Sequence, residues 1–140
     1  MKKITYSAFI LAMALIFVLT LASCEKEAGG LWDNATYQTD TELGEGAKTL
    51  VVEVFAEDKG VTFTIHTDED TVGAALLELG LLSGEAGQYG LYVKEVNGIV
   101  ADFDQDQSYW AFYINGEYAM TGVDGTEIEE GAVYRLAYTK

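Results

Sequence analysis

The stretch over residues 109–138 reads YWAFYINGEYAMTGVDGTEIEEGAVYRLAY and carries the strongest short-range hairpin signal of the chain. In it, Asn115-Gly116 separates two apolar-rich runs, residues 110–114 and 118–120. Both turn residues tolerate the positive φ that a type I′ turn requires, so the pattern predicts a β-hairpin. Residues 133–138 form a last predicted strand after a glycine-punctuated turn region. The stretch holds seven of the chain's 17 aromatic residues and no nucleophile beside a base, which favours a binding or scaffolding surface.

Two strands are predicted upstream of this stretch. Residues 49–56 and 61–66 alternate between apolar and polar positions, which is the period of a half-buried strand. The expected buried side chains are Leu50, Val52, Val54, Ala56, Val61, Phe63 and Ile65. The single histidine, His66, then falls on the polar face of its strand, and we expect it to be solvated.

One helix is predicted to follow these strands. Asp70 or Thr71 can cap its first turn, and an apolar stripe recurs at helical spacing. The stripe is Val72, Ala75, Leu76 and Leu79. Residues 89–96 and 99–103 then flank a second Asn-Gly turn. This order predicts an α+β, β-grasp-like fold, with one helix packed on a mixed or antiparallel sheet of about five to six strands.

The same motifs resemble the transcobalamin-like C-terminal domain, which in bacteria is catalogued mostly as a domain of unknown function. The residues that carry the resemblance are Tyr109-Trp110, the strand 111–114, Asn115-Gly116, Gly122-Val123-Asp124, the acidic turn 127–131, the closing strand 134–138 and the upstream run 93–98. The resemblance covers roughly residues 48–140.

The resemblance implies a candidate ligand. In the vitamin-carrier relatives, this domain covers one face of cobalamin while a separate helical domain holds the other. The chain has no such helical domain, so the resemblance implies weak binding of a corrinoid at most. Bacteria also use the domain in surface and adhesion-type proteins, which leaves a protein or glycan partner open.

The N-terminal sequence predicts a bacterial lipoprotein signal peptide over residues 1–23. Lys2-Lys3 forms a positive region, and residues 8–20 form an uncharged, mostly apolar run. Residues 21–24, LASC, resemble a lipobox, so Cys24 is the predicted lipid attachment site. Residues 24–48 lack apolar periodicity and predict a flexible acidic tether, in which Trp32 is expected to be a mobile aromatic residue, with docking onto the domain as the alternative. Residues 49–140 are then the globular domain, on the outer face of the membrane.

The net charge is strongly negative. The chain has a formal charge of −15, with 8 Lys+Arg against 23 Asp+Glu. Such a surface repels phosphate backbones, so nucleic acid is excluded as a partner class.

The candidate ligand site is aromatic. Along residues 109–114 both faces are apolar or aromatic, although one helix can cover only one face of a sheet. Tyrosine suits an exposed site because one end is apolar and the other forms hydrogen bonds. The predicted ligand-binding residues are Tyr109, Trp110, Tyr113, Asn115, Gly116, Tyr118 and Gly122. A flat ring system would stack on the aromatic side chains.

A weak metal site is the remaining candidate. Asp102, Asp104 and Asp106 have the spacing of the first three ligands of a calcium loop. However, Gln107 stands where such a loop needs glycine, and Tyr113 where it needs a bidentate glutamate. The pattern therefore predicts an irregular calcium site or a solvated acidic loop. With one histidine and no cysteine in the domain, we expect no enzymatic activity.

Overall fold

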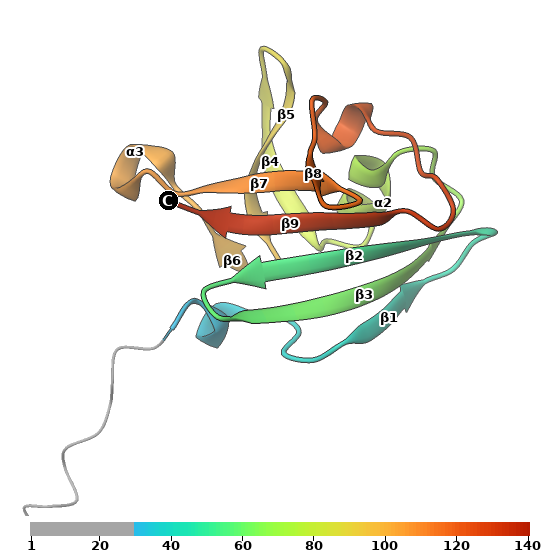
Figure 1. Cartoon of the computed structure of the whole chain (residues 1–140), viewed down its shortest axis with the longest axis horizontal. Coiled ribbons are helices and arrows are strands. Elements are labelled where there is room, and N and C mark those ends of the chain that lie inside the picture. Colours follow the sequence, from blue (N-terminus) through green and yellow to red (C-terminus); the bar gives the residue numbers. More distant parts are fainter. Residues whose placement is uncertain (1–29) are drawn as a thin grey trace, which may run out of the picture.

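A computed structural model gives the structure of the protein and describes residues 30–140. A six-stranded sheet with the strand order β1-β3-β2-β9-β7-β8 forms its centre (Figure 1). These strands are β1 (Thr41–Gly44), β2 (Lys48–Ala56), β3 (Lys59–Thr67), β7 (Tyr109–Ile114), β8 (Glu117–Tyr118) and β9 (Val133–Thr139). The sheet is mixed, because β1 runs parallel to β3 and β2 runs parallel to β9.

The alternation predicted for the central strands is confirmed. Every second residue of β2 and β3 is buried on the same face of the sheet, including all seven side chains expected there. The predicted hairpin is also present, since β7 and β8 pair antiparallel around Asn115 and Gly116, whose φ values are 51° and 83°. These positive φ values are the reason that Asn-Gly occupies this turn.

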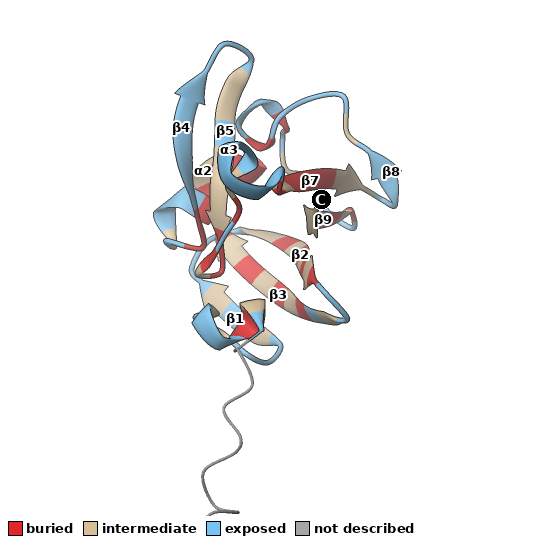
Figure 2. Cartoon of the chain, turned by 90° about the vertical axis from the view of Figure 1, so that its left-hand side faces the viewer, coloured by how far each residue is buried: buried red, intermediate tan, exposed pale blue. Residues whose placement is uncertain are grey.

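A helix and a second sheet cover the buried face. Helix α2 (Val72–Glu78) begins at Thr71, whose Oγ1 accepts a hydrogen bond from the N–H of Ala74 at 3.2 Å. Beside it lie the antiparallel strands β4 (Leu82–Gly87), β5 (Gly90–Val96) and β6 (Ile99–Val100). The covering layer is therefore more than the single predicted helix, and the fold class is α+β. Buried residues lie between the two layers, while the β4–β5 hairpin projects into solvent (Figure 2).

Strand β4 and helix α3 (Phe103–Asp106) were not expected from the sequence. β4 reads LSGEAG and has no β-branched residue, so pairing with β5 rather than local propensity makes it a strand. The strand predicted over residues 99–103 is wrong after Val100. Asp102 caps the short helix there by accepting from the N–H groups of Asp104 and Gln105.

The structure differs from the flexible tether expected over residues 24–48. Residues Leu31–Asn34 form a 3-10 helix, η1, and β1 forms the edge of the main sheet. Trp32 is only 7% exposed and belongs to the core, and its Nε1 donates to the carbonyl of Ala56 at 2.8 Å. These contacts join residues far apart in the sequence, so local periodicity could not indicate them. Residues 1–29, with the predicted signal peptide and Cys24, lie outside the described residues.

Among residues 30–140, no helix has the length and apolar character needed to cross a membrane.

Candidate functional site

A groove opens between the β4–β5 hairpin and the segment that follows β8. Its volume is about 460 Å³. Trp110, Phe112 and Leu136 from β7 and β9 contribute to its lining from the main sheet. One wall comes from the hairpin and its turn: Tyr89, Leu91, Tyr92 and Val93. The opposite wall is the chain from Tyr118 to Val123, and the start of β7 adds Tyr109.

The rim of this groove exposes large apolar side chains. Tyr89 is 92% exposed and Met120 is 95% exposed, on opposite walls. Tyr92 and Tyr118 are also exposed large side chains of the lining. Exposed apolar surface often marks a site for a ligand or a partner, so this rim is the candidate site.

Asp124 fixes the position of the hairpin relative to the opposite wall. Its Oδ2 accepts from the N–H of Leu91 at 3.1 Å, which ties β5 to the 3-10 helix η2 (Val123–Gly125). Gly90 allows this contact, because a Cβ there would lie 2.9 Å from Asp124 Oδ1. This hydrogen bond fixes the positions of the two walls of the groove relative to each other.

Trp110 contributes an unused hydrogen-bond donor beside the groove. The residue is 7% exposed, and its Nε1 is buried without a hydrogen-bond partner among the described residues. Its ring packs edge-on against Tyr138, with centroids 5.7 Å apart. An unpaired buried N–H is uncommon in folded proteins and typically costs about 1–3 kcal/mol of stability.

The structure brings four of the predicted ligand-binding residues together in the groove: Tyr109, Trp110, Tyr118 and Gly122. The other three, Tyr113, Asn115 and Gly116, are not part of its lining. Tyr113 instead pairs in register with Arg135 and packs edge-on against Tyr118 at 5.6 Å. Asn115 has a structural role, since its Oδ1 accepts from the N–H of Val133 at 2.9 Å.

Sequence analysis missed the groove residues Tyr89, Tyr92 and Met120. All three lie in segments that the sequence identified as strand or hairpin, although the structure places Tyr89 in the turn before β5. All three are large apolar side chains close to glycine residues. They form one site only because the tertiary structure brings them together. Nothing local in the sequence relates residue 89 to residue 120.

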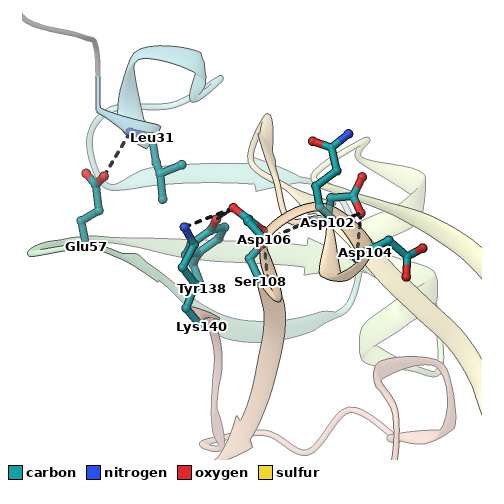
Figure 3. Close-up of polar contacts among 9 residues, drawn as sticks. Leu31, Glu57, Asp102, Asp104, Asp106, Ser108, Tyr138 and Lys140 are labelled. Atoms are coloured by element: carbon teal, nitrogen blue, oxygen red, sulfur yellow. Dashed lines mark hydrogen bonds and ion pairs between the residues drawn. The ribbon is translucent and has the colours of Figure 1, made fainter.

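The three aspartates proposed as a calcium site do not converge on one point (Figure 3). Asp102 is used as the cap of α3, while Asp106 accepts from the Ser108 hydroxyl at 2.5 Å and pairs with Lys140 at 3.2 Å. The hydrogen bond from Ser108 is the main cause that lowers the pKa of Asp106, and the contact with Lys140 lowers it further. The contact between Asp106 and Lys140 also raises the pKa of Lys140. Across residues 30–140, no three Asp, Glu, His or Cys side chains lie close enough to hold a metal ion.

His66 has more partners than a solvated strand residue. Its Nε2 lies 2.6 Å from Glu42 Oε1, and its Nδ1 lies 3.1 Å from the Thr49 hydroxyl. Glu42 comes from β1, the strand that sequence analysis assigned to the tether. The trio therefore links β1, β3 and β2 on the polar face of the sheet.

Comparisons with known proteins agree with this architecture. The model of a domain of unknown function, DUF4430, matches residues 69–140. A crystal structure of a candidate metal binding protein from Ruminococcus gnavus ATCC 29149 is similar, with 30% identity and a TM-score of 0.63. That similarity covers 67% of this chain and 98% of the other.

A more distant structure shares the fold alone. Haptocorrin in complex with Cbi has 14% identity and a TM-score of 0.53, over 66% of this chain and 25% of haptocorrin. No curated protein matches the sequence. The match to the family model spans about half of the chain, and the related bacterial structure is covered almost completely. The chain therefore belongs to the DUF4430 family of domains of unknown function.

Proposed function

We propose that this protein is a non-catalytic binding module whose aromatic groove captures a flat ring-bearing ligand, with a corrinoid as the leading candidate. The observation that carries the proposal is the groove itself, whose walls expose Tyr89 and Met120 almost completely. Exposed apolar patches on protein surfaces often mark ligand or partner sites. A groove of about 460 Å³ lies within the size range of small-molecule sites.

The groove has the chemistry that a corrinoid requires. Its aromatic side chains can pack against the apolar parts of a macrocycle, and its tyrosine hydroxyls can exchange hydrogen bonds with amides at the ring edge. Gly122 lets the backbone approach a ligand closely. The fold shared with haptocorrin, which was crystallised with Cbi, supports the same ligand class.

The affinity of such a module is expected to be modest. The groove can cover only one side of a macrocycle, and binding must offset the lost freedom of the ligand. A Kd between micromolar and millimolar, which corresponds to about 4–8 kcal/mol, is therefore the expected range. We assign the module no catalytic role, because its lining contains no titratable group other than tyrosine.

Titration with cobalamin and cobinamide tests this proposal. We expect saturable quenching of tryptophan fluorescence, because Trp110 contributes to the groove lining while Trp32 is buried elsewhere. A Tyr89→Ser/Met120→Ser variant should bind at least about fivefold more weakly if these residues anchor the ligand, since truncating an anchor residue costs about 1 kcal/mol or more. Both residues are almost fully exposed, so the variant should keep its stability.

Phe103→Ser is the matched control. Phe103 is also an exposed aromatic residue, but it lies on α3 and outside the groove lining. The control should bind like the unmodified protein. Absence of binding up to about a millimolar, or equal weakening by both variants, would reject ring capture in the groove. In that case a surface protein or glycan becomes the better candidate for the exposed aromatic rim.

We further propose that the module is held on the outer face of a bacterial membrane by a lipid on Cys24. The support is the order of a positive start, an apolar run and the LASC sequence at residues 21–24. Labelling with radioactive palmitate in a bacterial host should mark the unmodified protein and leave Cys24→Ala unlabelled. Equal labelling of both proteins, or labelling of neither, would refute the lipid anchor.

A further inference from the structure

The groove is lined without a single charged side chain. Its 14 lining residues are apolar, aromatic, glycine or threonine. The carboxylate of Asp124 lies at the edge of the groove, because it contacts the lining residue Leu91 and a Cβ on the lining residue Gly122 would be 3.0 Å from its Oδ1. A bound ligand would therefore meet neutral walls with negative charge behind them.

The cations of the described chain are engaged with partners, and one of them, Lys94, also lies near the groove, with its Nζ 5.9 Å from the centre of the Tyr92 ring. Four of them form ion pairs with carboxylates: Lys48 with Asp70, Lys94 with Glu85, Arg135 with Glu53 and Lys140 with Asp106. The fifth, Lys59, donates to Gln38 and lies 4.8 Å from the centre of the Trp32 ring, which belongs to another part of the core. None of the five contributes to the groove lining. Among residues 30–140, the cation that an anionic ligand would meet by the Tyr92 wall is Lys94, whose charge is already paired with Glu85 at 3.3 Å.

The remaining surface is strongly acidic. Residues 30–140 carry 21 Asp+Glu against 5 Lys+Arg, so most carboxylates have no cationic partner. An anionic ligand that enters an apolar groove loses hydration, which costs free energy. The negative potential of the acidic surface also repels it before contact.

We infer that the groove is a charge filter, which accepts uncharged or cationic planar rings and rejects rings that bear carboxylates or phosphates. This inference rests on the proposed ring capture and specifies its ligand class. A macrocycle with carboxamide side chains fits the filter, because its oxygens accept hydrogen bonds without carrying charge. A macrocycle with carboxylate side chains, such as haem, does not.

Two corrinoids with the same ring test the filter. Dicyanocobinamide carries amides, whereas dicyanocobyrinic acid carries carboxylates at the corresponding positions. We expect the acid to bind at least about tenfold more weakly at low salt, and the difference to shrink as added salt shortens the Debye length from about 30 Å to about 3 Å. The titration is performed on the full domain, residues 30–140, with fluorescence as the readout.

The variant Asp124→Asn assigns the effect to the groove. It removes the negative charge at the edge of the groove and keeps an oxygen that can accept from Leu91. The acid should gain about two- to fivefold in affinity relative to the amide, because one exposed charge contributes a fraction of the total field. Asp58→Asn, in the exposed β2–β3 turn remote from the groove lining, is the control for net charge and should change neither.

The outcomes separate the two hypotheses. If both corrinoids bind equally, or if salt does not change their ratio, the charge filter is overturned while ring capture stands. If neither corrinoid binds, ring capture is rejected and the filter with it. If Asp58→Asn relieves the discrimination as much as Asp124→Asn does, general net charge rather than the groove is responsible, and the filter is overturned as a property of the site.

Discussion

Trp32 shows how a single residue changes the boundary of the domain. Its ring is 7% exposed, its Nε1 donates to Ala56, and the Lys59 ammonium lies over its face. The residue stands in a segment of acids, glycines and threonines, which is the composition of a tether. A buried aromatic residue outweighs such a composition, because burial of one large side chain contributes several kcal/mol.

Trp32→Ala should therefore destabilise the domain severely. Removal of a buried aromatic side chain typically costs about 3–5 kcal/mol, and here the carbonyl of Ala56 also loses its donor. Urea unfolding of residues 30–140 measures this loss as a lower midpoint with an unchanged slope. Phe103→Ala, an exposed aromatic substitution, should change the midpoint little. Equal midpoints for Trp32→Ala and the unmodified domain would show that Trp32 belongs to a mobile arm and not to the core.

At the level of elements, η1 and β1 are an integral part of the main sheet. β1 pairs in parallel with β3 over four residues, and Asn97 clamps Tyr37 through two hydrogen bonds of 2.9 Å. Asn97 itself is 1% exposed and occupies the β5–β6 turn, so the N-terminal segment contacts both sheets. The segment is a strap across the fold.

A domain that begins at Thr49 should be less stable than one that begins at Gly30. The shorter chain loses Trp32 and the partners of Asn97, whose side chain would be left buried and unpaired. We expect a fall in stability larger than that of Trp32→Ala, and loss of cooperative unfolding if the whole margin of about 5–15 kcal/mol is consumed. Calorimetry of both lengths is the measurement. Similar melting temperatures would show that the strap is dispensable.

The start of α2 should show a measurable pH dependence. Lys48 in β2 donates to Asp70, just before α2, at 2.7 Å and thereby lowers the pKa of Asp70. A carboxyl group whose pKa is lower in the folded state stabilises the fold above its unfolded pKa, near 3.8. This contribution is lost as the pH falls through the lowered folded value. Asp70→Asn should therefore lose a small amount of stability at pH 7 and none at pH 2, in parallel urea titrations.

Strands with local alternation could be predicted from the sequence, and the elements that depend on distant partners could not. The sequences of β2, β3, β7 and β9 are alternating or rich in aromatic residues. The Asn-Gly pairs predict turns with positive φ, and the structure has them. In contrast, β4 (LSGEAG) consists mostly of small residues, and the sequence of β1 (TELG) has no alternation of apolar and polar residues long enough to predict a strand. The groove shares this limit, because Trp110 and Tyr118 belong to the predicted hairpin while Tyr89 joins them only through the fold.

At the scale of the whole molecule, the start of the described chain and the hairpin wall of the groove lie at opposite ends of the domain. The described chain begins beside η1, and the tip of the β4–β5 hairpin lies at the other end in both views (Figure 1, Figure 2). Because η1 is packed into the core, no long tether separates the domain from Cys24. The intervening residues 25–30 can span at most about 20 Å.

If Cys24 carries a lipid, this short connection should hold η1 near the membrane and direct the groove away from it. Asp33→Cys and Tyr89→Cys, each labelled with a donor fluorophore, can report the orientation on vesicles that contain an acceptor lipid. Both positions are exposed, and lipidation of Cys24 leaves the introduced thiol as the labelling site. Energy transfer should be stronger from position 33 than from position 89, and absent from both after Cys24→Ala. Equal or stronger transfer from position 89 would mean that the hairpin lies on the membrane, where the aromatic rim would contact lipid instead of a ligand from the medium.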